Sequence, residues 1–172
     1  MNLNNWIEKT TDITSTVIDG VNSYRERRKE RKAQKAAERK AAYEDKLASA
    51  AWIDDNDDAE TIWLWGVSDH QWNLEKVYKM HGGDLNKDWD AVDVDCFLTF
   101  SRNKKANTTL HLEIWVEYDG IKLGAVPDTM FEEVWNRWQE TGSKKQRVAT
   151  RARIYNRLTD SKHPRFGIKA TL

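Results

Sequence analysis

The chain has 172 residues, and its 28 basic and 28 acidic side chains cancel. It holds no apolar run of about 20 residues, which a membrane-spanning helix needs, and its start lacks the basic and apolar regions of a secretory signal peptide. Its one cysteine, Cys96, excludes an intrachain disulfide and a cysteine-rich zinc cluster. We therefore expect a soluble, cytoplasmic protein.

The charges are distributed unevenly along the chain. Residues 1–51 carry eleven basic and eight acidic side chains, residues 52–119 carry six and fifteen, and residues 120–172 carry eleven and five. Both ends are therefore basic and the middle is acidic. Such a distribution bears on partners and association rather than on fold.

Residues 1–51 predict a helical arm with two parts. In residues 3–24 the apolar side chains recur at spacings of three and four, which predicts an amphipathic helix. Residues 24–46 hold ten basic and five acidic side chains among alanines, which is typical of an exposed helix with ion pairs four residues apart. The arm is either a solvated connecting helix or a docking element for its own domain, a protein partner, a second copy, nucleic acid or an anionic membrane.

An acidic linker is predicted at residues 52–60, which contain the run DDNDD, and the folded domain is predicted at residues 61–172. Clustered carboxylates can bind metal ions. This run, however, lacks the glycine and the terminal glutamate of a helix-loop-helix calcium site, so we expect no metal there.

The domain is predicted to open with a strand at residues 61–67 that has large apolar side chains on both faces, as in strands covered on both sides. Ser68 and Gln71 have the spacing of a capping box, and the helix that follows ends at Gly82 and Gly83. Tryptophan side chains are mostly buried, so we expect a core position, with a stacking platform as the alternative, for Trp63, Trp65, Trp89 and Trp115.

The rest of the domain is predicted to be mostly antiparallel sheet. Apolar and polar residues alternate over residues 92–100 and 110–118, on either side of a polar loop, and Asp119-Gly120 predicts a tight hairpin turn. Pro127 precedes a second helix, and alternation returns in the last two strands. We therefore predict an α+β fold: a small OB-like antiparallel β-barrel with two packed helices, preceded by a long charged helix.

The segment Glu117–Pro127, EYDGIKLGAVP, followed by a helix and two strands, resembles the HIRAN and bacterial HIRAN-like domains over residues 61–172. The upstream stretch WLWGVSDHQWNLEKVYKMHGG is similar to the opening of that family. The resemblance implies an OB-like barrel that binds single-stranded DNA ends. Asn103 stands for the asparagine of the family's binding loop, that loop's aromatic and aspartate have no counterpart, and Ala125 replaces the family's tyrosine.

No catalytic constellation is evident in the sequence. The four histidines lack metal-ligand spacing, and Cys96 falls on the inward face of its strand, as expected of a buried structural thiol. We therefore predict a non-enzymatic protein without a cofactor or a metal ion.

The strongest binding signal is the outward face of residues 147–157, where arginines alternate around one aromatic ring. Phosphate contacts beside a stacking ring are what a single-strand groove requires. The residues predicted to bind single-stranded DNA or RNA are Arg147, Arg151, Arg153, Tyr155 and Arg157, with Asn103, Lys104 and Lys105 at the rim.

Two alternatives remain open at this point. The arginines can balance the outward carboxylates of Asp93 and Asp95 on a neighbouring strand, since antiparallel strands often pair opposite charges. The protein can also be an interaction or assembly adaptor that uses residues 3–24 to bind a protein partner or a second copy. A membrane surface is a third possible partner.

Overall fold

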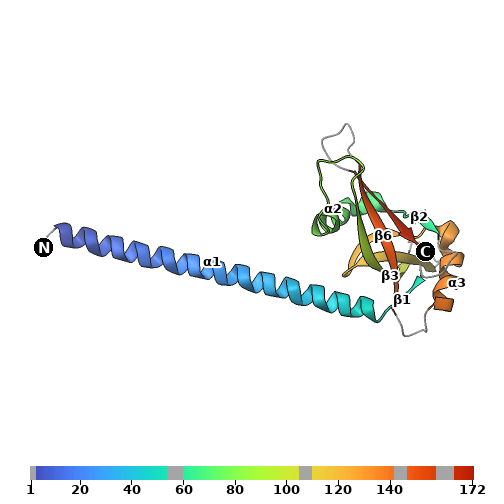
Figure 1. The fold of residues 1–172 in the computed structure, drawn as a ribbon, viewed down its shortest axis with the longest axis horizontal. Helices are drawn as coiled ribbons and strands as arrows, with labels where there is room; N and C mark the ends of the chain where they lie inside the picture. Colours follow the sequence, from blue (N-terminus) through green and yellow to red (C-terminus); the bar gives the residue numbers. More distant parts are fainter. Residues whose placement is uncertain (1–2, 54–59, 105–109, 142–146, 158–164) are drawn as a thin grey trace. The chain divides into compact units, whose positions relative to one another are not determined.

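The computed structural model describes residues 3–53, 60–104, 110–141, 147–157 and 165–172; for residues 3–20, 102–104, 110 and 111 it describes the backbone alone. The chain divides into two compact units, Met1–Asp45 and Lys46–Leu172. The first unit belongs to one helix, and the second is an α+β domain built on a curled antiparallel sheet (Figure 1).

Helix α1, Leu3–Ala48, is continuous across both parts of the predicted arm. Its side chains from residue 21 to residue 42 are exposed on every side of the helix, and ion pairs such as Lys29–Glu26 at 2.9 Å join successive turns. This matches the exposed charged helix predicted for residues 24–46 except at Tyr43, whose side chain is buried. The apolar stripe predicted within residues 3–24 lies largely on side chains outside the described ones. None of the helices in the described ranges has the length and apolar character to cross a membrane.

The sheet of the second unit has the strand order β2-β7-β6-β3-β4-β5. Its strands are β2 Thr61–Trp63, β3 Ala91–Lys104, β4 Leu110–Tyr118, β5 Ile121–Ala125, β6 Val148–Arg157 and β7 Arg165–Thr171. The two ends of this order meet, because Trp65 N–H donates to the Ala125 carbonyl at 2.8 Å and Ala125 N–H donates back at 2.9 Å. The sheet is therefore curled and barrel-like, as the sequence predicted.

The domain begins earlier than predicted. Ala51–Trp52 form strand β1, which pairs in parallel with Val148–Ala149 of β6, and Ile53 is completely buried in the core. Residues 52 and 53 are therefore part of the folded domain rather than of a linker. The rest of the predicted linker, the acidic run at residues 54–58 included, lies outside the described residues apart from Glu60, whose N–H donates to the Leu172 carbonyl at 2.9 Å.

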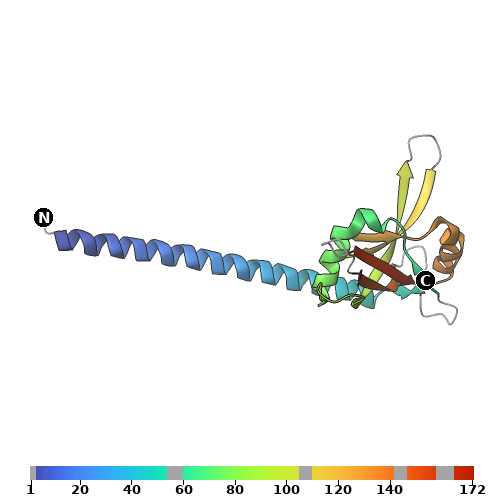
Figure 2. The ribbon, with the colours of Figure 1, turned by 90° about the horizontal axis from the view of Figure 1, so that it is seen from above.

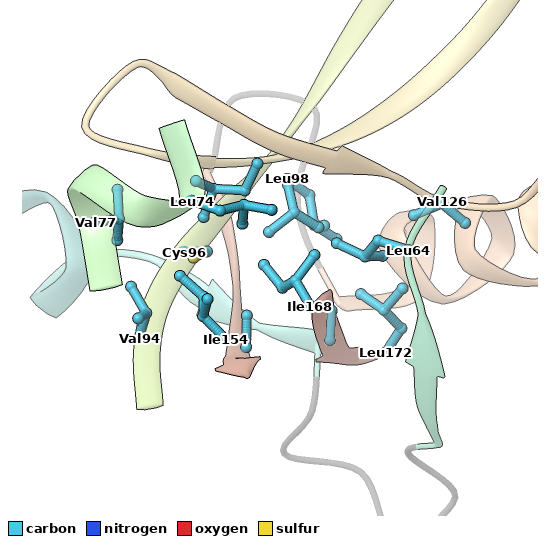
Figure 3. Close-up of a cluster of buried hydrophobic side chains, with 14 of the residues drawn as sticks. Leu64, Leu74, Val77, Val94, Cys96, Leu98, Val126, Ile154, Ile168 and Leu172 are labelled. Atoms are coloured by element: carbon cyan, nitrogen blue, oxygen red, sulfur yellow. The ribbon is translucent and has the colours of Figure 1, made fainter. Parts of the chain in front are cut away.

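The concave side of the sheet holds one apolar core (Figure 3). Alternate residues of β3, β6 and β7 point into it, as predicted, and Leu64 and Val126 join them from the two ends of the sheet order. Burial of such side chains is the main favourable term in folding. The labelled members in Figure 3 are Leu64, Leu74, Val77, Val94, Cys96, Leu98, Val126, Ile154, Ile168 and Leu172.

Two helices lie at opposite sides of this sheet domain in both ribbon views (Figures 1 and 2). Helix α2, Gln71–Met80, follows the 3-10 turn η2, Val67–His70, and buries Leu74, Val77 and Tyr78. Helix α3, Phe131–Thr141, follows the 3-10 turn η3, Asp128–Met130, and buries Val134.

The predicted capping box at Ser68 and Gln71 is wrong. Helix α2 starts at Gln71 itself. The side chain of Gln71 contacts strand β7 instead of Ser68. The Gln71 amide nitrogen donates to the Phe166 carbonyl at 2.9 Å, and its oxygen accepts from the Phe166 N–H at 2.7 Å. The two hydrogen bonds to Phe166 satisfy both the N–H and the carbonyl of that residue where they are partly buried. They are therefore favoured over a local hydrogen bond to Ser68.

The polar loop after β3 is shorter than predicted. Strand β3 continues through residues 101–104, where Asn103 pairs with His111 and Lys104 with Leu110 of β4. Strand β3 thus pairs with β6 over its first half and with β4 over its second half, and Phe97 pairs with both. The far ends of β3 and β4 extend beyond the rest of the domain in Figure 2.

The Cys96 thiol is completely buried in the core, and this burial, together with the negative charge of Asp95, raises its pKa. Because a thiolate is the reactive form, we expect the folded protein to resist an aromatic disulfide reagent at mildly alkaline pH. The same protein unfolded in urea should react fully within minutes. Release of the coloured thiolate checks this, and fast reaction of the folded protein would place Cys96 at the surface.

Candidate functional site

The outer side of β6 carries a charged row that crosses four strands. Directly opposite residues in an antiparallel sheet present side chains on the same face. The register of β2, β7, β6 and β3 therefore aligns Trp63, Lys169, Arg153 and Asp93. We call this surface the arginine face and define it by those four residues with Asp95, Arg151 and Tyr155.

Arg153 and Asp93 form a two-pronged ion pair at the centre of the arginine face. The Arg153 Nε and Nη2 donate to the two carboxylate oxygens of Asp93 at 2.6 and 2.9 Å. This contact lowers the pKa of Asp93 and raises that of Arg153. Both side chains are more than half exposed, so the pair contributes about 0–1 kcal/mol to stability. The charge balance expected between strands β3 and β6 is thus present at this pair.

An aromatic pair lies beside the ion pair. The rings of Trp63 and Tyr155 are tilted with centroids 5.5 Å apart, and the Lys169 Nζ lies 4.6 Å from the Trp63 centroid. Gly167 makes room for this arrangement, because a Cβ atom there would lie 2.9 Å from the Trp63 ring. The Trp63 ring therefore covers the backbone of β7 instead of pointing straight away from the sheet.

A groove of about 450 Å³ runs over the arginine face. Its lining includes three cations, two carboxylates, two threonine hydroxyls and a tyrosine ring: Arg151, Arg153, Lys169, Asp93, Asp95, Thr61, Thr171 and Tyr155. The Arg151 guanidinium also lies 5.1 Å from the centroid of the Trp52 ring. The groove can therefore contact a planar ring and an anionic group at the same time.

The structure brings three of the predicted binding residues, Arg151, Arg153 and Tyr155, together in the groove. Arg147 and Arg157 are exposed at the two ends of β6, over Phe97 and Trp89 respectively, with guanidinium-to-centroid distances of 5.7 and 5.2 Å. All five residues thus lie on β6 or directly before it, as expected.

The residues predicted to form the rim of the binding surface do not lie beside the arginine face. Asn103 belongs to the β3–β4 hairpin and is eight residues beyond Asp95, about 26 Å along the strand at about 3.3 Å per residue. Lys104 follows it in the same hairpin, and Lys105 is outside the described residues. The expectation that Asn103 and Lys104 lie in a loop at the edge of the basic strand is therefore wrong, because β3 leaves β6 at Phe97 to pair with β4.

The core position expected for the tryptophans is wrong in three of four cases. Trp63, Trp65 and Trp89 are 48, 54 and 55% exposed, whereas Trp115 is partly buried. Strand β2 is one end of the sheet order and is not covered on both faces as expected, so Trp63 lies on the outer side. The alternation of Trp63 with the part-buried Ile62 and the buried Leu64 was the available signal.

No protein-family model matches the chain, and no curated protein or solved structure is significantly similar to it. Among the described residues, no three histidine, cysteine, aspartate or glutamate side chains gather as a metal site would require.

Proposed function

We propose that the domain of residues 46–172 is a non-enzymatic module that binds single-stranded nucleic acid along the arginine face. The alternation of cations and rings on that face carries the proposal: Lys169 lies against both Trp63 and Tyr155, with Arg153 in the next strand. Single-strand binding sites combine a positive groove for the backbone with aromatic rings on which bases stack.

Single strands fit this surface better than duplexes. The Trp63 ring is about half exposed and lies against Gly167 of β7, so a base must leave its own stack to cover it. Three cations against two carboxylates leave the groove with a small positive charge, which suits the contact with a phosphate or two at a time.

We further propose that the curled sheet is an OB-like barrel of the HIRAN kind. The order β3, β4, Asp119-Gly120 turn, β5, Pro127, α3, β6 and β7 supports this proposal. The ligand surface proposed here nevertheless differs from the binding loop of that family, since the rings and cations gather on β2, β6 and β7.

Fluorescence anisotropy with a labelled oligothymidine of about 10–15 nucleotides tests the function over a salt series. We expect the affinity to fall by about three- to sevenfold from about 50 to about 200 mM salt, as one or two phosphate contacts predict. Arg151→Ala and Lys169→Ala should each weaken binding by about five- to tenfold, since each removes a cation from the groove.

Lys76→Ala is the matched control, because Lys76 also lies over a tryptophan ring, that of Trp72, but on α2. It should leave binding unchanged. Absence of binding at the lowest salt, or an equal loss with Lys76→Ala, would end the proposal.

Gly167→Ala should weaken oligothymidine binding by about three- to tenfold. The new Cβ atom forces the Trp63 ring off β7 and away from Tyr155, while alanine suits a strand at least as well as glycine does. The unfolding midpoint is therefore expected to change by less than about 3 °C. Anisotropy and thermal unfolding followed by circular dichroism measure the two effects. Unchanged binding would show that the tilt of the Trp63 ring is irrelevant.

A second candidate function is that of an assembly adaptor. The observation that favours it is the exposure of α1 between residues 21 and 42, where Val21 and Tyr24 are 45 and 67% exposed. Sedimentation velocity of the full chain and of a chain beginning at Lys46 tests self-association, and liposome flotation tests an anionic membrane as the partner. Monomeric behaviour of both chains, without flotation, would leave only a different protein as partner.

A further inference from the structure

Trp89 has a backbone conformation that tryptophan rarely adopts. Its φ is +57°, and among the described non-glycine residues only Asp119, in the β4–β5 turn, shares a positive φ. A bulky residue in this region is strained, and such strain persists only where the surroundings impose it. Asp119 lies in the turn between β4 and β5, and Trp89 lies in a turn of the loop that precedes β3.

The backbone around Trp89 is held by a buried asparagine of β6. Asn156 is completely buried, and its side-chain amide donates to the carbonyls of Leu85 and Lys87 at 3.1 and 3.0 Å. Its backbone N–H donates to the Asp90 carbonyl at 2.8 Å. The chain is therefore tied to β6 on both sides of Trp89.

A second anchor acts from α2. The Tyr78 hydroxyl donates to the Asp90 carboxylate at 2.6 Å and lies 3.0 Å from the Asp84 carbonyl, and the Asp84 N–H donates to the same carboxylate at 3.0 Å. These bonds lower the pKa of Asp90, so it is a carboxylate at neutral pH. Helix α2 and strand β6 together fix this loop.

The Trp89 ring itself takes no part in the core. It is 55% exposed, and its partner is the exposed Arg157, whose guanidinium lies 5.2 Å from the ring centroid. Asn156, which holds the loop, is the residue between Tyr155 and Arg157. Tyr155 pairs with Ala91, two residues after Trp89. The Trp89 ring thus lies next to Arg157, where the outer side of β6 continues beyond Tyr155.

We infer that Trp89 is a prepositioned stacking platform for a base at one end of the bound single strand, with Arg157 contacting the neighbouring phosphate. This inference rests on the proposed function. A ring whose position is set by the fold loses little conformational entropy when a ligand covers it, which favours binding. A cation beside the ring suits a strand that offers a base and a phosphate together better than it suits an apolar protein surface.

Trp89→Asn separates the two roles of this residue. Asparagine accepts a positive φ readily, so the variant should unfold at the same temperature as the wild type or higher. It should also bind oligothymidine about five- to 100-fold more weakly in the full-length protein, which is the effect of losing one stacked base. Trp89→Phe keeps a ring and should stay within about threefold of the wild type.

An abasic oligonucleotide of the same length is the second probe. The wild type should lose more affinity than Trp89→Asn when the bases are removed, because the variant has one stacking contact fewer. Wild-type binding with no effect of Trp89→Asn would overturn this inference and leave the proposed function standing. A lower unfolding temperature of Trp89→Asn would also overturn it, since the ring would then be structural. No binding by the wild type would overturn both.

Discussion

Asn156→Ala is expected to lower the free energy of unfolding by about 3 kcal/mol. The side-chain amide of Asn156 donates to the carbonyls of Leu85 and Lys87, and more weakly to that of Asp84 at 3.4 Å. Alanine would leave these part-buried acceptors without the amide donor, and a polar group that loses its partner costs about 1–3 kcal/mol. Urea unfolding followed by circular dichroism measures the change.

Asn86→Ala is the matched control for this prediction. Asn86 is an exposed asparagine of the same loop, with its side-chain nitrogen 3.2 Å from the Asp84 carboxylate. Its loss should cost less than about 0.5 kcal/mol. A loss below about 1 kcal/mol for Asn156→Ala would mean that water replaces the asparagine amide at little cost.

The double substitution Asp93→Asn with Asp95→Asn is expected to tighten the binding of oligothymidine by about tenfold or more at low salt. In the free protein Asp93 holds Arg153 through two hydrogen bonds, so a phosphate has to displace this carboxylate. Asparagine presents one neutral acceptor and removes the negative charge. The salt dependence should also steepen, by about 0.7 in log–log slope for each additional phosphate that the protein neutralises.

Asp119→Asn serves as the control because it also replaces a carboxylate with an amide, although one instead of two, in the β4–β5 turn, where asparagine suits the positive φ. It should change the affinity by less than about twofold. Weaker binding by the double variant would show that the carboxylates orient the cations for the ligand. Unchanged binding would favour the interpretation that the arginines of β6 only balance the carboxylates of β3.

The fold was predictable where a local pattern and a long-range contact agree. Strands β6 and β7 and the Asp119-Gly120 hairpin follow directly from period-two alternation and turn chemistry. The prediction failed where a distant strand decided the outcome. Gln71 bonds to Phe166, 95 residues away, and β3 continues to Lys104 because β4 lies alongside it.

The candidate site was predictable only in part for a similar reason. The arginines of β6 stand out in the sequence because they alternate with buried residues. Their aromatic partners come from other strands and loops: Trp52 from β1, Trp63 from β2 and Trp89 from the segment before β3. The general tendency of tryptophan to be buried does not predict exposed rings that lie against a glycine or a guanidinium of another strand.

The paired hydrogen bonds between Trp65 and Ala125 affect how the domain behaves at high concentration. An open sheet has two edges, and each edge offers unpaired backbone groups to another chain. Here Trp65, two residues after β2, is hydrogen-bonded to Ala125 at the edge of β5. At this point neither edge offers its backbone groups to a strand of another chain. Loss of this junction would free both edges together, and fibril formation would then compete with refolding.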